Sequence, residues 1–186
     1  MNRRHLVAGL SGVAALPWAV WFAPGRALAQ PASPSAPTSP INADEYKRLT
    51  LAAGTLAKQS SELALQKAVN PKVKQFAGFE VAEQTAIAQV LTNQLNPPAA
   101  PLSDKHAAVL KGLQDASGAE FDKAYVKAQI EGHSELLTIQ DAHTLGRGQD
   151  SASILATDTA RVATLAKAVI QMHLTLLKDL NDATRG

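Results

Sequence analysis

Two carboxylates stand where the sequence predicts the buried face of a helix. Residues 71–95 carry apolar side chains at three- and four-residue steps, and Glu80 and Glu83 occupy two positions of that stripe. An ionised carboxylate that is buried without a partner costs several kcal/mol. We therefore expect both to be protonated, paired, metal-bound or turned outward. The stripe consists of Val73, Phe76, Glu80, Glu83, Ile87 and Val90.

His133 is the candidate partner for these carboxylates. It lies on an apolar stripe of a helix expected over 117–145, and helix midpoints stay level whether helices run parallel or antiparallel. Glu83 and His133 both fall at such midpoints, so Glu80, Glu83 and His133 are candidate ligands of a transition metal, as in carboxylate–histidine bundle sites. A buried Glu–His hydrogen bond or a solvated face is the favoured alternative, because no expected helix carries the Glu-x-x-His pair of di-iron proteins.

His173 belongs to the last expected helix. With a midpoint near residue 165 for that helix, His173 is expected at the level of Asp122 and Tyr125, where a structural hydrogen bond would join two helices. The sequence has no serine elbow, glycine-rich phosphate loop or zinc signature. No catalytic residue is therefore assigned, and a protein that is not an enzyme is favoured.

The candidate residues are positioned by a series of amphipathic helices. We expect long helices over 44–68, 71–95 and 117–145, a fourth from a cap at Asp150 or Ser151 to 180, and a short helix over 103–113. Four such helices bury their stripes most simply in an all-α four-helix bundle. The 96–118 connection is compatible with a ferritin-like crossover and with a local return, so the topology stays open.

The composition suits an aliphatic helical core and excludes several classes of protein. Apolar residues make up 46% of the 186 residues, charged residues 18% and aromatic residues 4%. There is no cysteine, which excludes disulfides, thiolate metal sites and a cysteine nucleophile. Removing Arg3, Arg4 and Arg26 with the leader changes the net charge from +2 to −1, so we expect no nucleic-acid partner.

The N-terminus has the pattern of a secretory signal over residues 1–29. Arg3 and Arg4 precede an apolar stretch from Leu6 to Ala23, and the sequence Ala27-Leu28-Ala29 suits a signal peptidase. The two arginines fit either the general secretory route or the twin-arginine route. A Pro/Ser-rich linker is expected over 30–41 and the helical domain over 42–186. We expect a periplasmic or secreted protein, with no membrane insertion after cleavage.

Two segments resemble an exported bacterial family called domain of unknown function 4142. They are the run from Gln59 to Ala77 and the run from Phe121 to His133, which resembles the family's Phe-Asp-x-x-Tyr…His signature. His173 matches a histidine that members tend to carry in the last helix, and the resemblance covers roughly residues 42–180. It implies a ferritin-like bundle and export, without an established activity.

The sequence departs from that family at two positions of the expected mid-height. Members often have an acidic residue followed by histidine where this chain has Glu83-Gln84, and a glutamate where it has Ala57. If the family binds a metal there, the resemblance implies that this chain has lost ligands.

These observations favour an envelope or stress-related binding protein without catalytic activity. The alternative is a metal-binding or redox bundle with a partly degenerate carboxylate–histidine site. A third hypothesis is a small-ligand carrier, with room left by small residues, and a homo-oligomer is also open. The small residues are Gly54, Ala57, Gly78 and Gly132.

We predict that cells expressing the whole chain release a protein that starts at Gln30. The measurement is the intact mass of the protein from the periplasmic fraction. Replacing Arg3 and Arg4 with lysine should block export only if the twin-arginine route is used. Full-length protein retained in the membrane fraction would contradict the cleavage prediction.

Overall fold

The computed structural model describes residues 39–145 and 157–185, and all regular structure in these ranges is helical. The prediction of an all-α domain is therefore confirmed. The expected signal peptide, residues 30–38 of the linker and the expected cap at Asp150 or Ser151 lie outside the described residues. The helices are α1 (Ala43–Lys67), α2 (Pro71–Thr92), α3 (Asp104–Asp115), α4 (Gly118–Thr144) and α6 (Asp158–Arg185).

Asparagine residues mark the start of α1 and both ends of α2. Asn42 Oδ1 accepts a hydrogen bond from the Glu45 N–H at 2.9 Å, and Asn70 Oδ1 accepts one from the Lys72 N–H at 2.9 Å. Pro71 follows Asn70 at the first helical position, where its missing N–H costs nothing. Asn93 ends α2 in a left-handed conformation with φ 54°, two residues before the expected end at 95.

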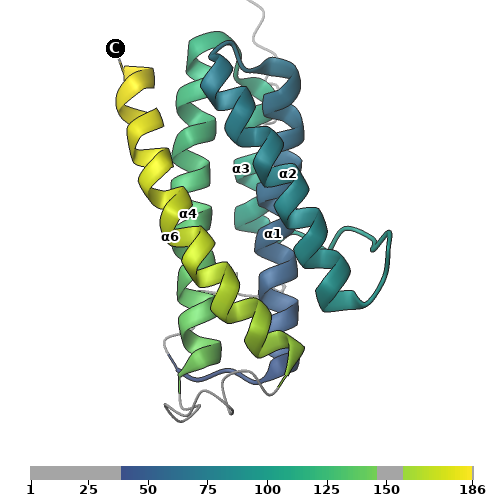
Figure 1. Cartoon of the computed structure of the whole chain (residues 1–186). Coiled ribbons are helices and arrows are strands. Elements are labelled where there is room, and N and C mark those ends of the chain that lie inside the picture. The colour runs from purple at the N-terminus through teal and green to yellow at the C-terminus, as the bar shows by residue number, and fades with distance from the viewer. Residues whose placement is uncertain (1–38, 146–156, 186) are drawn as a thin grey trace, which may run out of the picture. The chain divides into compact units, whose positions relative to one another are not determined.

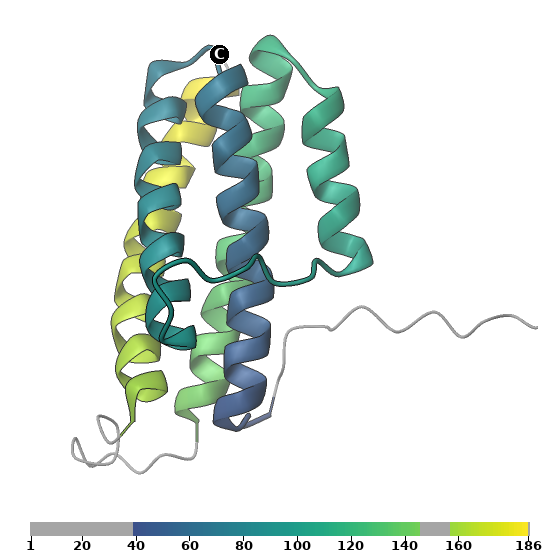
Figure 2. The same ribbon diagram turned by 90° about the vertical axis from the view of Figure 1, so that its right-hand side faces the viewer.

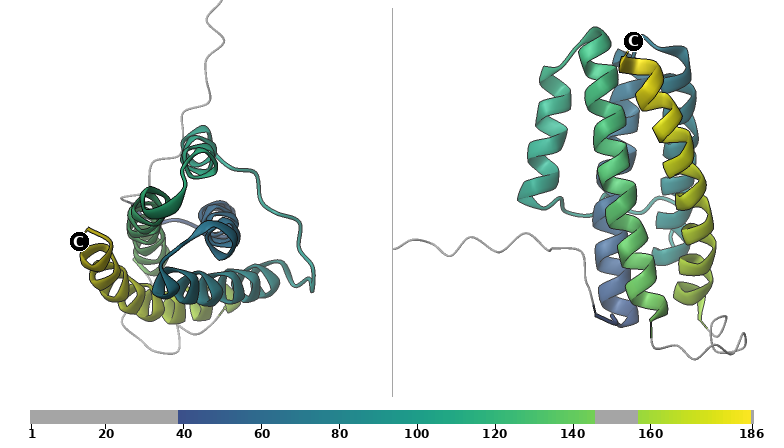
Figure 3. Two further views of the ribbon diagram at one scale, coloured as in Figure 1. Left: turned by 90° about the horizontal axis from the view of Figure 1, so that it is seen from above. Right: turned by 90° about the vertical axis from the view of Figure 1, so that its left-hand side faces the viewer.

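The long helices lie side by side, and the path between α2 and α4 is long (Figure 1). In this view α1 rises, α2 descends, α3 rises, α4 descends and α6 rises. The 93–103 connection passes across α1 to reach α3 (Figure 2), and α3 lies outside, against α1 and α4 (Figure 3). Consequently α2 and α4 run in the same direction, although the short α3 separates them in sequence.

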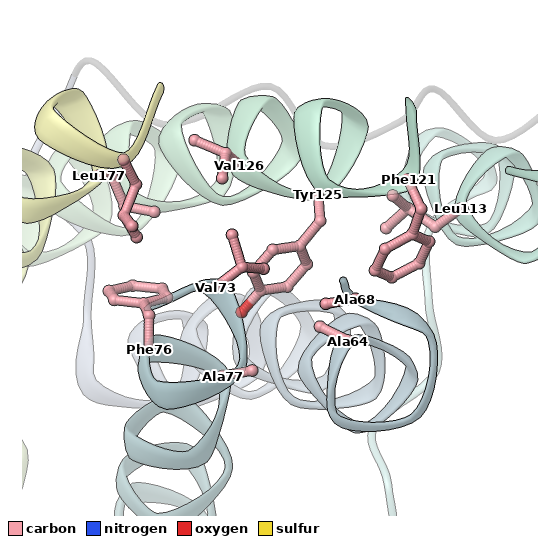
Figure 4. Close-up of a cluster of buried hydrophobic side chains, with 11 residues drawn as sticks. Ala64, Ala68, Val73, Phe76, Ala77, Leu113, Phe121, Tyr125, Val126 and Leu177 are labelled. Carbon is pink, nitrogen blue, oxygen red and sulfur yellow. The ribbon is translucent and has the colours of Figure 1, made fainter. Parts of the chain in front are cut away.

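The core consists of two apolar clusters at opposite ends of the domain. The first lies where α1 turns into α2 and α3 into α4 (Figure 4), and the second lies toward the start of α1. The first is built from Ala64, Ala68, Val73, Phe76, Ala77, Leu113, Phe121, Tyr125, Val126, Leu177 and Leu180. The second is built from Tyr46, Leu49, Ala53, Leu91, Leu136, Ile139, Ala163, Ala166 and Ile170.

Buried polar residues separate the two clusters along each of the four long helices. Each side chain is at most 4% exposed, and in its helix it falls between residues of the first cluster and residues of the second. We refer to these residues as the polar layer, and each one needs hydrogen-bond partners in place of water. The polar layer consists of Ser60, Ser61, Glu80, Gln84, Gln129, His133 and His173.

None of the helices in the described ranges is both long and apolar enough to cross a membrane.

Asp122 fixes the turn between α1 and α2 from the neighbouring α4. Its side chain is 2% exposed, and its two oxygens accept hydrogen bonds from the Val69 N–H at 3.2 Å and the Asn70 N–H at 2.8 Å. We predict that Asp122→Ala lowers the free energy of unfolding by about 2–3 kcal/mol, because two N–H groups lose a charged acceptor. Urea unfolding followed by circular dichroism measures the change.

The matched control for this prediction is Asp115→Ala. Asp115 is 66% exposed and pairs only with Lys111 at 2.9 Å, so its removal should cost less than about 0.5 kcal/mol. Equal losses from the two variants would contradict the role given to Asp122.

Candidate metal centre

Glu80 of α2, His133 of α4 and His173 of α6 meet in the polar layer. Glu80 Oε1 lies 2.8 Å from His173 Nδ1 and 3.2 Å from His133 Nε2, and the two ring nitrogens are 3.2 Å apart. The three residues are 0%, 0% and 4% exposed. One carboxylate and two imidazoles from three helices therefore converge on a single buried point, with ligand atoms close enough to share a metal ion.

The backbone of α4 decides which nitrogen of His133 faces this point. Nδ1 of His133 is 2.8 Å from the carbonyl oxygen of Gln129. Because a carbonyl can only accept, Nδ1 carries the proton and donates it. In the neutral ring Nε2 then has a free lone pair, directed at Glu80 and His173, and this is the tautomer that metal-binding histidines adopt.

The three converging groups offer more acceptors than donors. His173 Nδ1–H can donate to Glu80 Oε1, whereas Glu80 Oε2 is buried and has no hydrogen-bond partner. A neutral His133 adds a further lone pair. A shared proton or a cation is needed to balance this set, because lone pairs facing each other in a dry interior repel.

The surroundings of Glu80 shift pKa values in both directions. Burial acts to raise the pKa of Glu80, but a hydrogen bond from His133 when its ring is protonated, a hydrogen bond from His173 and the charges of both rings outweigh it and bring the pKa to about 2. For His173, burial acts to lower the pKa, whereas the hydrogen bond to Glu80 and the charges of Glu80 and Glu83 raise it overall. The site therefore favours a negative Glu80 beside a positive charge.

Glu83 lies on the opposite side of the His173 ring. Its Oε2 is 3.6 Å from His173 Nε2, and its side chain is 20% exposed at a cleft between α2 and α6. Burial, followed by the charge of Glu80, raises the pKa of Glu83. Glu83 is thus not one of the three converging groups, but it is placed to orient the His173 ring from the side opposite Glu80.

A hydrogen-bonded network from α1 holds α4 in register. Gln129 Nε2 donates to Ser60 Oγ at 2.9 Å and lies 3.2 Å from Ser61 Oγ. Ser61 Oγ donates to the Ala57 carbonyl at 2.7 Å, so the Tyr125 hydroxyl, 2.8 Å away, donates to Ser61. Because Gln129 also supplies the carbonyl that His133 binds, this network positions the candidate ligand.

Phe76 closes the site on the side of the first apolar cluster. Its ring centroid is 5.1 Å from that of His173, in an edge-on arrangement, and 6.0 Å from that of His133. The phenyl ring lowers the local dielectric and strengthens the interactions of Glu80 with the two histidines.

Of the six residues singled out in the sequence, Asp122 and Tyr125 lie away from the candidate metal centre. The other four lie at it: Glu80, Glu83, His133 and His173. Glu80 and His133 come together as a buried pair, and Glu83 lies beside them. Tyr125 contacts Ser61 and Asp122 contacts Val69 and Asn70, whereas His173 contacts Glu80 and His133 instead.

His173 is the candidate ligand that the sequence reasoning missed. A helix starting at 150 or 151 has its midpoint near residue 165, which places His173 about two turns too far along. The described α6 runs from Asp158 to Arg185, so its midpoint is near residue 172. The match of His173 to a family histidine was the sequence signal that could have identified it.

The comparison with protein families covers most of the chain. The profile of a family described as Domain of unknown function (DUF4142) matches residues 27–180. No curated protein and no solved structure gives a significant match.

We predict that the metal-free protein loses stability in acid through Glu80. Because the pKa of Glu80 falls from 4.5 to about 2 on folding, its contribution is complete above pH 4.5 and is lost as the pH falls toward 2. Relative to the Glu80→Gln variant, the wild type should lose roughly 3 kcal/mol between pH 6 and pH 2. Urea unfolding in a chelator, at a series of pH values, measures this difference; parallel curves for the two proteins would contradict it.

Proposed function

Starting from the fact that the chain belongs to the DUF4142 family, we propose that it is a metal-binding helical protein. Its site holds one divalent first-row transition metal ion through Glu80, His133 and His173. The observation that carries the proposal is the convergence of these three side chains, with the His133 lone pair directed inward by the Gln129 carbonyl.

The spacing of the ligand atoms supports coordination without rearrangement of the helices. Ligand atoms at about 2.0–2.1 Å from a tetrahedral metal ion are roughly 3.3 Å apart. The three separations here are 2.8, 3.2 and 3.2 Å. An ion would replace the proton that Glu80 and the imidazoles share, and it would give Glu80 Oε2 the partner that it lacks.

The donor set favours some metal ions over others. Two imidazole nitrogens and one carboxylate suit zinc, iron, manganese or copper, whereas calcium and magnesium prefer oxygen ligands alone. The ligands are also enclosed by Phe76 and by three helices. Three protein ligands leave a fourth coordination position, but the burial of the ligands shields that position from substrate, and this favours metal binding or storage over catalysis.

We further propose that the domain is a four-helix bundle with ferritin-like connectivity. The parallel directions of α2 and α4, and the crossing 93–103 connection with α3, support this assignment (Figure 2). The site differs from the di-iron sites of such bundles because one carboxylate and two histidines suit a single ion.

The proposed setting is the cell envelope. The paired arginines, the apolar stretch and the Ala27-Leu28-Ala29 sequence support export. An exported protein meets metal ions outside the cytoplasm, and a chain without cysteine binds them only through nitrogen and oxygen ligands.

We predict that the purified protein, stripped with chelator, binds one Co²⁺ or Zn²⁺ ion per chain. Binding should raise the melting temperature because only the folded state assembles the site. Glu80→Ala, His133→Ala and His173→Ala should each abolish this rise and the visible absorption of bound Co²⁺. Elemental analysis gives the stoichiometry, and calorimetry gives the affinity.

The matched control is His106→Gln. His106 is also a buried histidine next to a carboxylate, with Nε2 3.2 Å from Glu135 Oε1, but it lies on α3 and outside the triad. This variant should bind metal as the wild type does. The proposal would be refuted if Co²⁺, Zn²⁺, Mn²⁺ and Fe²⁺ all left the melting temperature of the wild type unchanged. Undiminished metal binding by the Glu80, His133 and His173 variants would also refute it.

A separate prediction concerns Glu83, which lies next to the candidate ligand His173 but is not one of the three converging groups. A carboxylate behind a metal-binding imidazole orients the ring and increases its basicity, and its loss typically weakens binding about 10- to 100-fold. We expect Glu83→Gln to weaken Co²⁺ binding by that factor while the one-to-one stoichiometry remains. Glu131→Gln, at an exposed carboxylate of α4, serves as the control, and equal affinities in all three proteins would refute the role of Glu83.

A further inference from the structure

The outer surface of α2 and α6 is apolar over most of its length. We call it the α2/α6 face, and Figure 1 looks onto these two helices. Five large apolar side chains on it are 42–70% exposed, and two apolar clefts run between the helices. The five side chains are Phe79, Val90, Leu165, Met172 and Leu176.

On α6 three exposed residues and the half-buried Val169 form a second stripe beside the buried one. Leu165, Val169, Met172 and Leu176 follow one another at four-, three- and four-residue steps. This spacing is typical of a helix that packs lengthwise against another helix whose axis is nearly aligned with its own. The buried stripe of α6 already serves the core, so the second stripe is available for a contact outside the domain.

Charged residues on this face are few: Lys72 and Asp179 line one cleft and Glu83 lines the other. In α2 no Lys or Arg follows Lys74, and in α6 no charged residue occurs between Lys167 and Lys178. Depletion of charge at the centre is typical of protein–protein interfaces. The small number of basic residues near the apolar stripe argues against an anionic membrane surface, which attracts helices rich in Lys and Arg.

The exposed area matches what a homodimer needs. At about 180 Å² for a fully exposed side chain of this size, the five residues present roughly 500 Å² of apolar surface. A standard interface buries about 800 Å² per partner, and about 65% of a homodimer interface is apolar, which again gives roughly 500 Å². Roughly 500 Å² is the size of the largest apolar patch on a typical monomer, and such patches are often functional.

We propose that the chain forms a two-fold symmetric homodimer through the α2/α6 face. In such a dimer the same patch of each copy contacts its counterpart, and an apolar, nearly uncharged surface can pair with itself without charge repulsion. The proposal is independent of metal binding, because it uses the outer stripes of α2 and α6 and not their buried residues.

The first test is the mass of the purified protein by sedimentation velocity over a concentration series. We expect a dimer for the wild type and at least about a thirtyfold weaker association for Leu165→Glu and Phe79→Glu, which place charges in the interface. Leu95→Glu is the matched control because Leu95 is 82% exposed but lies on the 93–103 connection, and it should leave the dimer intact. Circular dichroism checks that each variant is folded.

The second test uses the absence of cysteine from the chain. Single-cysteine variants at Leu165, Val169, Met172 and Leu176 report which residue lies near the two-fold axis, where it meets its own copy within disulfide reach. We expect at least one of the four to form a disulfide-linked dimer under mild oxidation, and Leu95→Cys to stay monomeric on a denaturing gel. A monomeric wild type, a dimer that survives both glutamate substitutions, or four variants that do not cross-link would each overturn the proposal.

Discussion

The buried charge of Glu80 is the constraint on which the rest of the structure depends. A carboxylate that is 0% exposed is tolerable only with partners at hydrogen-bond distance, and here they come from two other helices. His133 and His173 can reach Glu80 only if α2, α4 and α6 are aligned to within a fraction of a turn. One interaction therefore sets the register of three helices, while Gln129 and the serines of α1 set that of the fourth.

The apolar clusters supply stability but little specificity. Leu, Val and Ala side chains above and below the polar layer would still make contact if one helix slid by a turn, because similar residues recur along each stripe. The polar layer does not tolerate such a slide, because it would leave Glu80, Gln129 or His133 without partners in a dry interior. The alignment that gives these groups their hydrogen-bond partners also brings the candidate ligand atoms of Glu80, His133 and His173 together.

The two positions at which the resemblance to the family implies a loss of ligands are not among the three converging groups. Gln84 is directed at α1, where a Cβ on Gly54 would lie 2.6 Å from its Oε1, and Ala57 contributes only its carbonyl to Gln129. The ligands that the resemblance implied to be lost would lie on the α1 side of the polar layer. The three converging groups come from α2, α4 and α6.

Periodicity and capping residues alone were enough to predict the helices, because the 3.6-residue repeat and caps such as Asn70 are local properties of the chain. They also identified Glu80 and His133 as polar residues on buried stripes. The third candidate ligand depended on where α6 starts and on how the long helices pack. Those features result from packing between segments far apart in sequence, and only the tertiary structure brought His173 to Glu80 and moved Asp122 and Tyr125 away from it.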